Sequence, residues 1–413
     1  MNVVIIGGGI IGLAGAYYLR KAGLEVSVVD KNDLTDGCSF GNIGYISPSH
    51  FIPLATPGII KQGMKWMMSS SSPFYIKPRL NADLVRWGLT FRKSANKSLV
   101  ERNAPHLNNL LQLSRQQMTD LKNDLDDFDL LEKGVFMLYK SEVTGHHEKE
   151  MAEQAKQFGL KTVICNKQQV QDYESETEVD VAGGVLYLDD CHVNPAKLMQ
   201  ALYKRLREMG VHFYLNAEVT DFEKTGNKIT SVVTHTQPIS ADEVIIANGS
   251  WMGELSKLLG IRILLQPGKG YSMVYDQLAQ NLQYPSILVD DRVATAPIDR
   301  WLRIGGTMEM SGHSDNILPK RVQSIYDAFK KYYPKMNLAQ PDTSKAWFGY
   351  RPVTPDGLPY IGRDNQYTNL TYAGGHAMMG VSCATGTGIL LNEIIQHKKT
   401  SINVNAFKPG RFN

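Results

Sequence analysis

The stretch VVIIGGGIIGLAGAYYLRKAGLEVSVVD, residues 3–30, decides the fold. VVII is an apolar run typical of a buried strand, and GGGIIG is a glycine turn. LAGAYYLRKAG predicts a helix that ends at Gly23, and EVSVVD predicts a second strand. A strand, a helix and a second strand in this order form a βαβ unit, which requires a parallel sheet at the start of the chain.

Gly7, Gly9 and Gly12 form the pattern GxGxxG between that strand and helix. The first glycine allows a tight turn, the second lets the backbone approach a pyrophosphate, and the third lets the helix pack closely on the strand. The helix directs its free N–H groups toward the phosphates. Asp30, at the end of the second strand, is placed to accept hydrogen bonds from a ribose. These features predict a dinucleotide site for the ADP moiety that FAD and NAD share.

The composition is that of a folded globular protein of two or three domains. The chain has 413 residues, 43% apolar and 21% charged, and a net charge of +3 that gives no reason to expect nucleic acid as a partner. The four cysteines are far apart and form no CxxC pair, so we expect neither a metal site nor a disulfide framework. No signal peptide and no apolar run of ~20 residues is evident. We therefore expect a cytoplasmic protein that at most rests on the inner face of the cell membrane.

The remaining pattern divides the chain into regions of different structure. Residues 59–132 are expected to be mainly helical, whereas residues 261–311 hold several strands without a helix between them, which favours an antiparallel sheet. GYRPVTPDGLPYIG, residues 349–362, predicts a rigid turn because its prolines fix φ and remove donors. That turn would hold Arg351 either in a surface salt bridge or against a substrate carboxylate.

A glycine-rich segment near the C-terminus, GGHAMMGVSCATGTG (374–388), runs into a predicted helix. If the helix begins beside a flavin ring, its dipole favours the negative charge that the ring acquires on reduction. A tight turn packed on the first strand explains the same glycines equally well.

The chain resembles the FAD-dependent enzymes of the D-amino acid oxidase type, which include D-amino acid dehydrogenase, glycine oxidase and sarcosine oxidase. The resemblance covers nearly the whole chain and is carried by SFGNIGYISP (39–48), ANGSW (247–251) and the two segments 349–362 and 374–388. The first of these is most similar to the D-amino acid dehydrogenases.

The resemblance implies a mixed α/β and α+β fold with two domains. A Rossmann-like FAD-binding domain would be assembled from residues 1–58, 166–255 and 340–413. A substrate domain with an antiparallel sheet and helices would comprise residues 59–165 and 256–339.

The resemblance also implies which residues contact FAD. We expect non-covalent binding, because the sarcosine oxidases attach flavin through a cysteine upstream of the segment that holds Arg351, and this chain has no cysteine between 192 and 382. The expected contacts, including the glycines of the turn, are Gly7, Gly9, Ile10, Ile11, Gly12, Asp30, Lys31, Ser39, Asn42, Gly44, Val219, Asn248, Gly249, Trp251, Gly375, His376, Met379 and Gly380.

For the substrate, the resemblance implies that Arg351 binds a carboxylate. Tyr271 stands where relatives often place a carboxylate-facing tyrosine, although a half-buried strand tyrosine explains it equally well. His50 and His376 are candidates for the pocket wall, and each alone is more often a packed histidine.

The implied activity is oxidative deamination of a D-amino acid, with hydride transfer from Cα to flavin N5 and electrons passed to a quinone or another carrier. Glycine or sarcosine oxidase and D-proline or hydroxy-D-proline dehydrogenase are alternatives of the same fold. A non-catalytic FAD-binding protein and an NAD-dependent dehydrogenase are alternatives of other classes.

The stretch GIIKQGMKWMM is relevant to whether the electron acceptor is a membrane quinone. It would place Ile59, Ile60, Met64 and Met67 on one helical face and Lys61, Gln62 and Lys65 on another. A helix of this kind can rest on a membrane surface or pack over the substrate domain.

Overall fold

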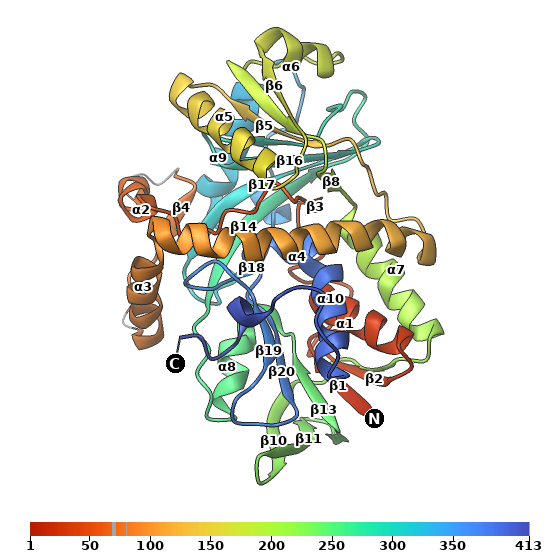
Figure 1. Ribbon diagram of the computed structural model, residues 1–413. Coiled ribbons are helices and arrows are strands. Elements are labelled where there is room, and N and C mark those ends of the chain that lie inside the picture. Colours follow the sequence, from red (N-terminus) through yellow and green to blue (C-terminus); the bar gives the residue numbers. More distant parts are fainter. Residues whose placement is uncertain (68–71, 80, 413) are drawn as a thin grey trace.

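Figure 1 shows the computed structural model, which describes residues 1–67, 72–79 and 81–412. A six-stranded sheet lies in the lower half of the view and a larger sheet in the upper half, and the long helix α4 (Lys97–Asp124) runs across the molecule between them (Figure 1). Both chain termini lie in the lower half. The mixed α/β class predicted from the sequence is confirmed.

The six-stranded sheet is built around the first strand of the chain. Every neighbouring pair in it is parallel except the antiparallel pair at one edge. The central strand is buried along nearly its whole length, which explains its continuous apolar run. In spatial order the strands are β19 (Tyr360–Arg363), β20 (Leu370–Gly374), β13 (Glu243–Ile246), β1 (Asn2–Ile6), β2 (Glu25–Val29) and β9 (His212–Tyr214).

Helices and a small sheet cover the two faces of this sheet. On one face, α1 (Ile10–Lys21), α7 (Pro195–Glu208) and α10 (Gly380–Ile395) form a core with β1 and β2. On the other face lie α8 (Met252–Lys257) and a three-stranded sheet. Its strands are β10 (Val219–Thr225), β11 (Lys228–Thr234) and β12 (Pro238–Ser240).

The larger sheet is mainly antiparallel, as predicted for residues 261–311, but the pairs β15–β5 and β17–β4 are parallel. The helix α9 (Pro319–Tyr332) packs on it, and α5 (Glu142–Gln157) and α6 (Lys167–Tyr173) lie at its far end. In spatial order its strands are β18 (Trp347–Val353), β14 (Gln266–Tyr275), β17 (Trp301–Met310), β16 (Val293–Ile298), β15 (Ser286–Leu288), β5 (Val135–Tyr139), β7 (Gly183–Tyr187) and β6 (Thr162–Asn166), with β4 (Phe74–Ile76) beside β17.

Two helices and two short strands complete the region between the sheets. Helices α2 (Ile59–Met67) and α3 (Ala82–Ser94) lie together at one side (Figure 1), and the short strands β3 (Tyr45–Ile46) and β8 (Cys191–His192) pair with each other. The sequence predicts Lys65 and Met67 on opposite faces of α2, but their side chains lie outside the described part of the chain.

The structure changes two expectations about residues 340–362. The predicted rigid turn begins only after Val353, because residues 347–353 form β18. Pro352 is compatible with a strand here because β18 is the edge of the larger sheet and pairs with β14 alone among the described strands. Because β7 and β18 both belong to the larger sheet, we propose that the domain boundaries expected at 166 and 340 lie instead near 190 and 354.

One segment, Ala377–Ile395, is long and apolar enough to cross a membrane, contrary to the expectation from the sequence that none would be. In the structure, 67% of its most apolar window is buried, and α10 packs against α1 and α4.

The packing at Gly12 generates a first prediction. A Cβ atom at this position would lie 1.9 Å from the carbonyl oxygen of Gly7, so the turn and α1 would have to move apart. We expect Gly12→Ala to lower the free energy of unfolding, measured by urea denaturation of the apoprotein, by about 1–3 kcal/mol or more.

A matched control is Gly88→Ala in α3, where an added Cβ has no neighbour within 4 Å. Removing a helical glycine should raise the free energy of unfolding by roughly 0.5–1 kcal/mol. Equal stability of Gly12→Ala and the wild type would contradict the packing described here.

Candidate active site

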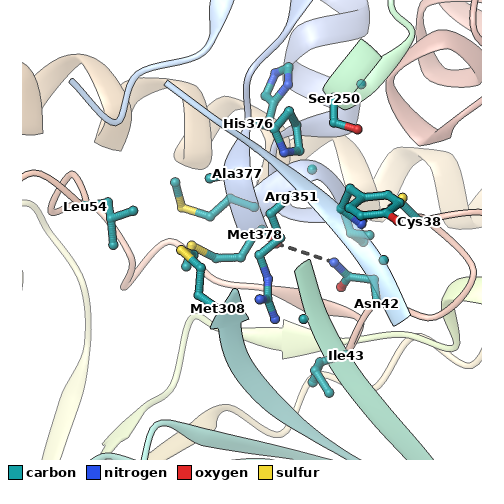
Figure 2. Close-up of a pocket in the computed structure, with 18 of the residues that line it drawn as sticks. Cys38, Asn42, Ile43, Leu54, Ser250, Met308, Arg351, His376, Ala377 and Met378 are labelled. Atoms are coloured by element: carbon teal, nitrogen blue, oxygen red, sulfur yellow. Dashed lines mark hydrogen bonds between the residues drawn. The ribbon is translucent and has the colours of Figure 1, made fainter. Parts of the chain in front are cut away.

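A cavity of about 2010 Å³ lies between the two sheets. Its wall includes the glycine turn after β1, the loop 38–43, the start of α10 and the face of the larger sheet around Arg351. Figure 2 shows the part of this cavity near Arg351. All of the site residues predicted from the sequence contribute to the wall except Gly12, Gly44 and Gly375.

The three glycines of the turn have different roles. At Gly7 a Cβ would meet the carbonyl oxygen of Ala247 at 2.6 Å, and at Gly12 it would meet Gly7, so the protein's own packing requires both glycines. At Gly9, the N-cap of α1, the nearest neighbour of an added Cβ would be Ser39 Oγ, 3.5 Å away. Packing therefore leaves room above Gly9, as expected where a pyrophosphate approaches the backbone. The turn fits a bound dinucleotide.

Asp30 and Lys31 form the end of the cavity predicted to hold the ribose. The Asp30 carboxylate accepts hydrogen bonds from the N–H groups of Gly8 (2.7 Å) and Asn32 (2.8 Å), which fix its position beside the turn. Burial raises the pKa of this carboxyl group. Lys31 Nζ lies 4.0 Å from the ring centroid of Trp251, so the two segments predicted to contact FAD meet here.

The loop 38–43 closes the cavity over the glycine turn. Ser39 Oγ accepts a hydrogen bond from the Ile10 N–H (3.0 Å), and Asn42 Nδ2 donates to the Met378 carbonyl (3.4 Å; dashed line in Figure 2). Asn42 Oδ1 accepts a hydrogen bond from the Gly44 N–H at 2.7 Å, although Gly44 itself does not line the cavity. Asn42 thus joins this loop to the start of the C-terminal segment.

Arg351 extends from the edge strand β18 across its neighbour β14. A Cβ at Gly270 of β14 would lie 2.2 Å from Arg351 Nη1, so the guanidinium group lies directly over Gly270. From there Nη1 donates a hydrogen bond to the Thr307 carbonyl on β17. Figure 2 shows the guanidinium group in the cavity between Met308 and Ile43.

The charge of Arg351 has no carboxylate partner among the described residues. Its one side-chain hydrogen bond there is the bond to Thr307, which leaves most of its N–H donors directed at the cavity. Desolvation lowers the pKa of Arg351 to about 10, so the group stays cationic at neutral pH. A desolvated cation without a counterion favours binding of an anion, and a planar guanidinium group favours a carboxylate.

The two predicted histidines both line the cavity and are neutral at neutral pH. Burial lowers the pKa of His376 to about 3 and that of His50 to about 4. His376 Nε2 lies 3.0 Å from Thr387 Oγ1, and His50 Nδ1 lies 3.1 Å from Ser49 Oγ. Neither histidine adds a positive charge that would compete with Arg351 for a bound anion.

Tyr271 does not face the Arg351 guanidinium group. Its hydroxyl group donates to Glu309 Oε2 at 2.8 Å, and its side chain belongs to the core under α9. Successive side chains of a strand point to opposite faces, and Gly270 lies under Arg351, so Tyr271 points to the other face of the sheet. This packing favours the alternative of a packed strand tyrosine over a tyrosine that faces the carboxylate.

Gly270 and Thr307 were not recognised from the sequence. A usable signal was present, because GKG (268–270) and GGT (305–307) place glycines inside two predicted strands. Glycine within a strand often marks a bulge or a close approach of another group. The contact between Arg351 and Thr307, however, depends on strand order and register, which no short motif specifies.

Comparison with known proteins agrees with this geometry. The sequence profile of the FAD-dependent oxidoreductase family matches residues 2–394. D-amino acid dehydrogenase from Helicobacter pylori (strain ATCC 700392 / 26695) is 31% identical over 403 residues, covering 96% of this chain and 95% of the relative. D-amino acid dehydrogenase from Bradyrhizobium diazoefficiens is 30% identical over 425 residues, covering 100% and 99%.

Solved structures share the fold at lower identity. Glycine oxidase from Geobacillus kaustophilus superimposes with a TM-score of 0.79 at 22% identity and covers 100% of this chain and 98% of that one. L-proline dehydrogenase from P. horikoshii has a TM-score of 0.76 at 20% identity and covers 100% and 97%. The family profile matches nearly the whole chain, the glycine turn is open above Gly9, and Asp30 is held beside that turn. The chain therefore belongs to the FAD-dependent oxidoreductase family and uses FAD as its cofactor.

Proposed function

We propose that this protein oxidises a D-amino acid to an imino acid, which hydrolyses to a 2-oxo acid and ammonia. The observation that carries this proposal is the Arg351 guanidinium group, which lines the cavity without a carboxylate partner in the described part of the chain. The names of the two relatives, both D-amino acid dehydrogenases, support the D configuration.

The chain's own residues would hold and orient the reactants. The turn at Gly9, the Asp30 carboxylate and the loop with Ser39 and Asn42 would hold FAD, non-covalently. Arg351 would bind the substrate carboxylate, which fixes one end of the amino acid and limits the directions in which its Cα–H bond can point. FAD, when bound, would supply the two-electron redox chemistry.

The start of α10 would contribute to the electrostatics of the same site. Met379 and Gly380 line the cavity at the N-terminus of this 16-residue helix, whose dipole favours negative charge. His376 and His50 are neutral, so they add no positive charge to this region.

An apolar cluster beside Arg351 would receive the substrate side chain. Nearly all of its members line the cavity, and Trp87 Nε1 fixes α3 to β18 by donating to the Val353 carbonyl at 2.9 Å. Figure 2 shows Met308 and Leu54 on this side of the guanidinium group. The cluster comprises Trp87, Met308, Met310 and Val353, with Leu54, Phe74, Ile76, Phe91 and Ala377 packed against it.

The electron acceptor is proposed to be a quinone or another respiratory carrier. Met64 of α2 and Val85 and Leu89 of α3 are large apolar side chains that are more than half exposed. Residues 59–97 carry eight Lys or Arg residues and one acidic residue, Asp83. Exposed apolar side chains among basic residues favour contact with an anionic membrane surface, where quinones reside. We therefore propose a cytoplasmic protein that works at this surface.

Replacing Arg351 tests the carboxylate site. Arg351→Ala should keep its FAD but lose ~2–5 kcal/mol of transition-state stabilisation, or roughly 30- to 5000-fold in kcat/KM. Arg351→Lys should recover only part of the loss because an ammonium group lacks the planar fork. Anaerobic stopped-flow reduction of the flavin by a series of amino acids measures both effects.

The control for that experiment is Arg321→Lys. Arg321 is buried, donates a hydrogen bond to the Ser72 carbonyl and does not line the cavity. Its replacement should leave kcat/KM within a few-fold of the wild type. Near-normal kcat/KM in Arg351→Ala would make Arg351 a structural residue, and failure of every amino acid to bleach the wild-type flavin would refute the proposed function.

The apolar cluster predicts the substrate preference. D-leucine and D-methionine should exceed D-aspartate in kcat/KM by roughly 100-fold or more, because an ionised carboxylate would lose its hydration there. Leu54→Lys should shift this ratio toward D-aspartate, whereas Leu188→Lys, at an exposed position outside the cavity wall, should not. A wild-type preference for glycine or sarcosine would favour the oxidase alternative, and one for D-proline would favour the cyclic-substrate alternative.

The exposed surface of α2 and α3 predicts the behaviour toward acceptors. Turnover of the best amino acid should be faster with a soluble quinone analogue than with oxygen, as measured by dye reduction and oxygen consumption. The protein should sediment with vesicles that contain phosphatidylglycerol and less with neutral vesicles. Oxygen turnover as fast as quinone turnover would instead identify an oxidase.

A further inference from the structure

A β-bulge lies next to Arg351 on strand β17. Gly306 of β17 pairs with Tyr271 of β14, and Glu309 pairs with Lys269. Thr307 and Met308 therefore stand opposite a single residue, Gly270, over which the Arg351 guanidinium group lies. Bulges of this kind reorient the groups of one strand and are frequent beside active sites.

Thr307 has a strained backbone within this bulge. Its φ is +62°, in the left-handed region that favours glycine, although threonine is β-branched. Glycine would adopt this conformation without strain, and two glycines, Gly305 and Gly306, directly precede it. A strained residue persists where the surrounding structure holds it, and such residues cluster at functional sites. The side chain of Thr307 is therefore the feature that needs an explanation.

The backbone and the side chain of Thr307 both bear on the carboxylate site. Its carbonyl oxygen accepts the hydrogen bond from Arg351 Nη1 and so fixes the guanidinium group over Gly270. Its hydroxyl group has no partner among the described residues, although the residue is only 8% exposed. Thr307 also lines the cavity. A buried hydroxyl group without a partner is unfavourable, so a ligand atom that pairs with it would gain affinity.

We propose that Thr307 is a second substrate-binding residue, whose hydroxyl group donates a hydrogen bond to the same carboxylate that Arg351 binds. This inference rests on the proposed function and adds to it a specific residue and a reason for the strain. The bulge presents the carbonyl of Thr307 to Arg351, and the residue lines the cavity, so one residue would both orient the guanidinium group and complete the carboxylate site.

The test measures binding of isocaproate, which is leucine without its amino group, to the oxidised FAD-loaded protein by the change in flavin absorbance. Thr307→Val keeps the shape but removes the hydroxyl group, and should raise the Kd roughly ten- to hundredfold, as expected for a hydrogen bond to a charged group. Thr307→Ser should stay within about threefold of the wild type because it keeps the donor. Thr354→Val is the matched control. Thr354 also has a buried hydroxyl group without a partner in the described structure, but it is not part of the cavity wall. Its replacement should therefore leave the Kd for isocaproate unchanged.

Stability of the apoprotein provides a readout that is independent of substrate and cofactor. Thr307→Gly should raise the Tm because it relieves the strain at φ +62°, and it should weaken isocaproate binding as Thr307→Val does. An unchanged Kd in Thr307→Val, or a lower Tm in Thr307→Gly, would overturn the role of Thr307. If amino acids still reduce the flavin in that case, the proposed function stands without Thr307. If neither isocaproate nor any amino acid affects the wild-type flavin, both proposals fail.

Discussion

The desolvated cation at Arg351 is the constraint on which the arrangement of the site depends. The residue is half-buried, its guanidinium group faces no carboxylate among the described residues, and desolvation lowers its pKa to about 10. Gly270 must lack a side chain so that the group can lie across β14. The bulge on β17 then presents the carbonyl of Thr307 to Nη1. Three neighbouring strands thus hold one positive charge at the cavity wall, and no carboxylate among the described residues pairs with it.

The proposed cofactor and substrate sites share structural elements and are not independent. Arg303 of β17 donates hydrogen bonds to the carbonyls of Phe40 (3.0 Å) and Asn42 (2.5 Å), and Ser272 of β14 donates to the Gly41 carbonyl (3.2 Å). The loop that covers the glycine turn is therefore fixed by the two strands over which Arg351 extends. Changes in the register of β14 and β17 would move both sites together.

The sequence alone predicted the parts of the molecule that depend on short-range patterns. The turn around Gly7, Gly9 and Gly12 and the position of Asp30 follow from local sterics, so a motif of about thirty residues was sufficient. Arg351 was predicted as a site residue from the family resemblance, and it does line the cavity. The secondary structure that holds Arg351 was not predicted. The prolines suggested a turn, whereas the chain forms an edge strand, which tolerates Pro352.

The face of the sheet to which a strand side chain points could not be predicted from the sequence. The register of β14 decides whether Tyr271 or Gly270 lies on the face with Arg351. A shift of the strand by one residue would move every side chain to the opposite face. The bulge at Thr307 adds such a shift, and it is set by pairing between strands that are distant in the sequence.

The most direct test of the central claim is a crystal structure of the oxidised, FAD-bound protein with the 2-oxo acid derived from leucine. The carboxylate should lie roughly 2.7–2.9 Å from the free N–H donors of Arg351, with Gly270 beneath the guanidinium group. A carboxylate bound by another cation, with Arg351 paired to a carboxylate of the protein, would contradict the account.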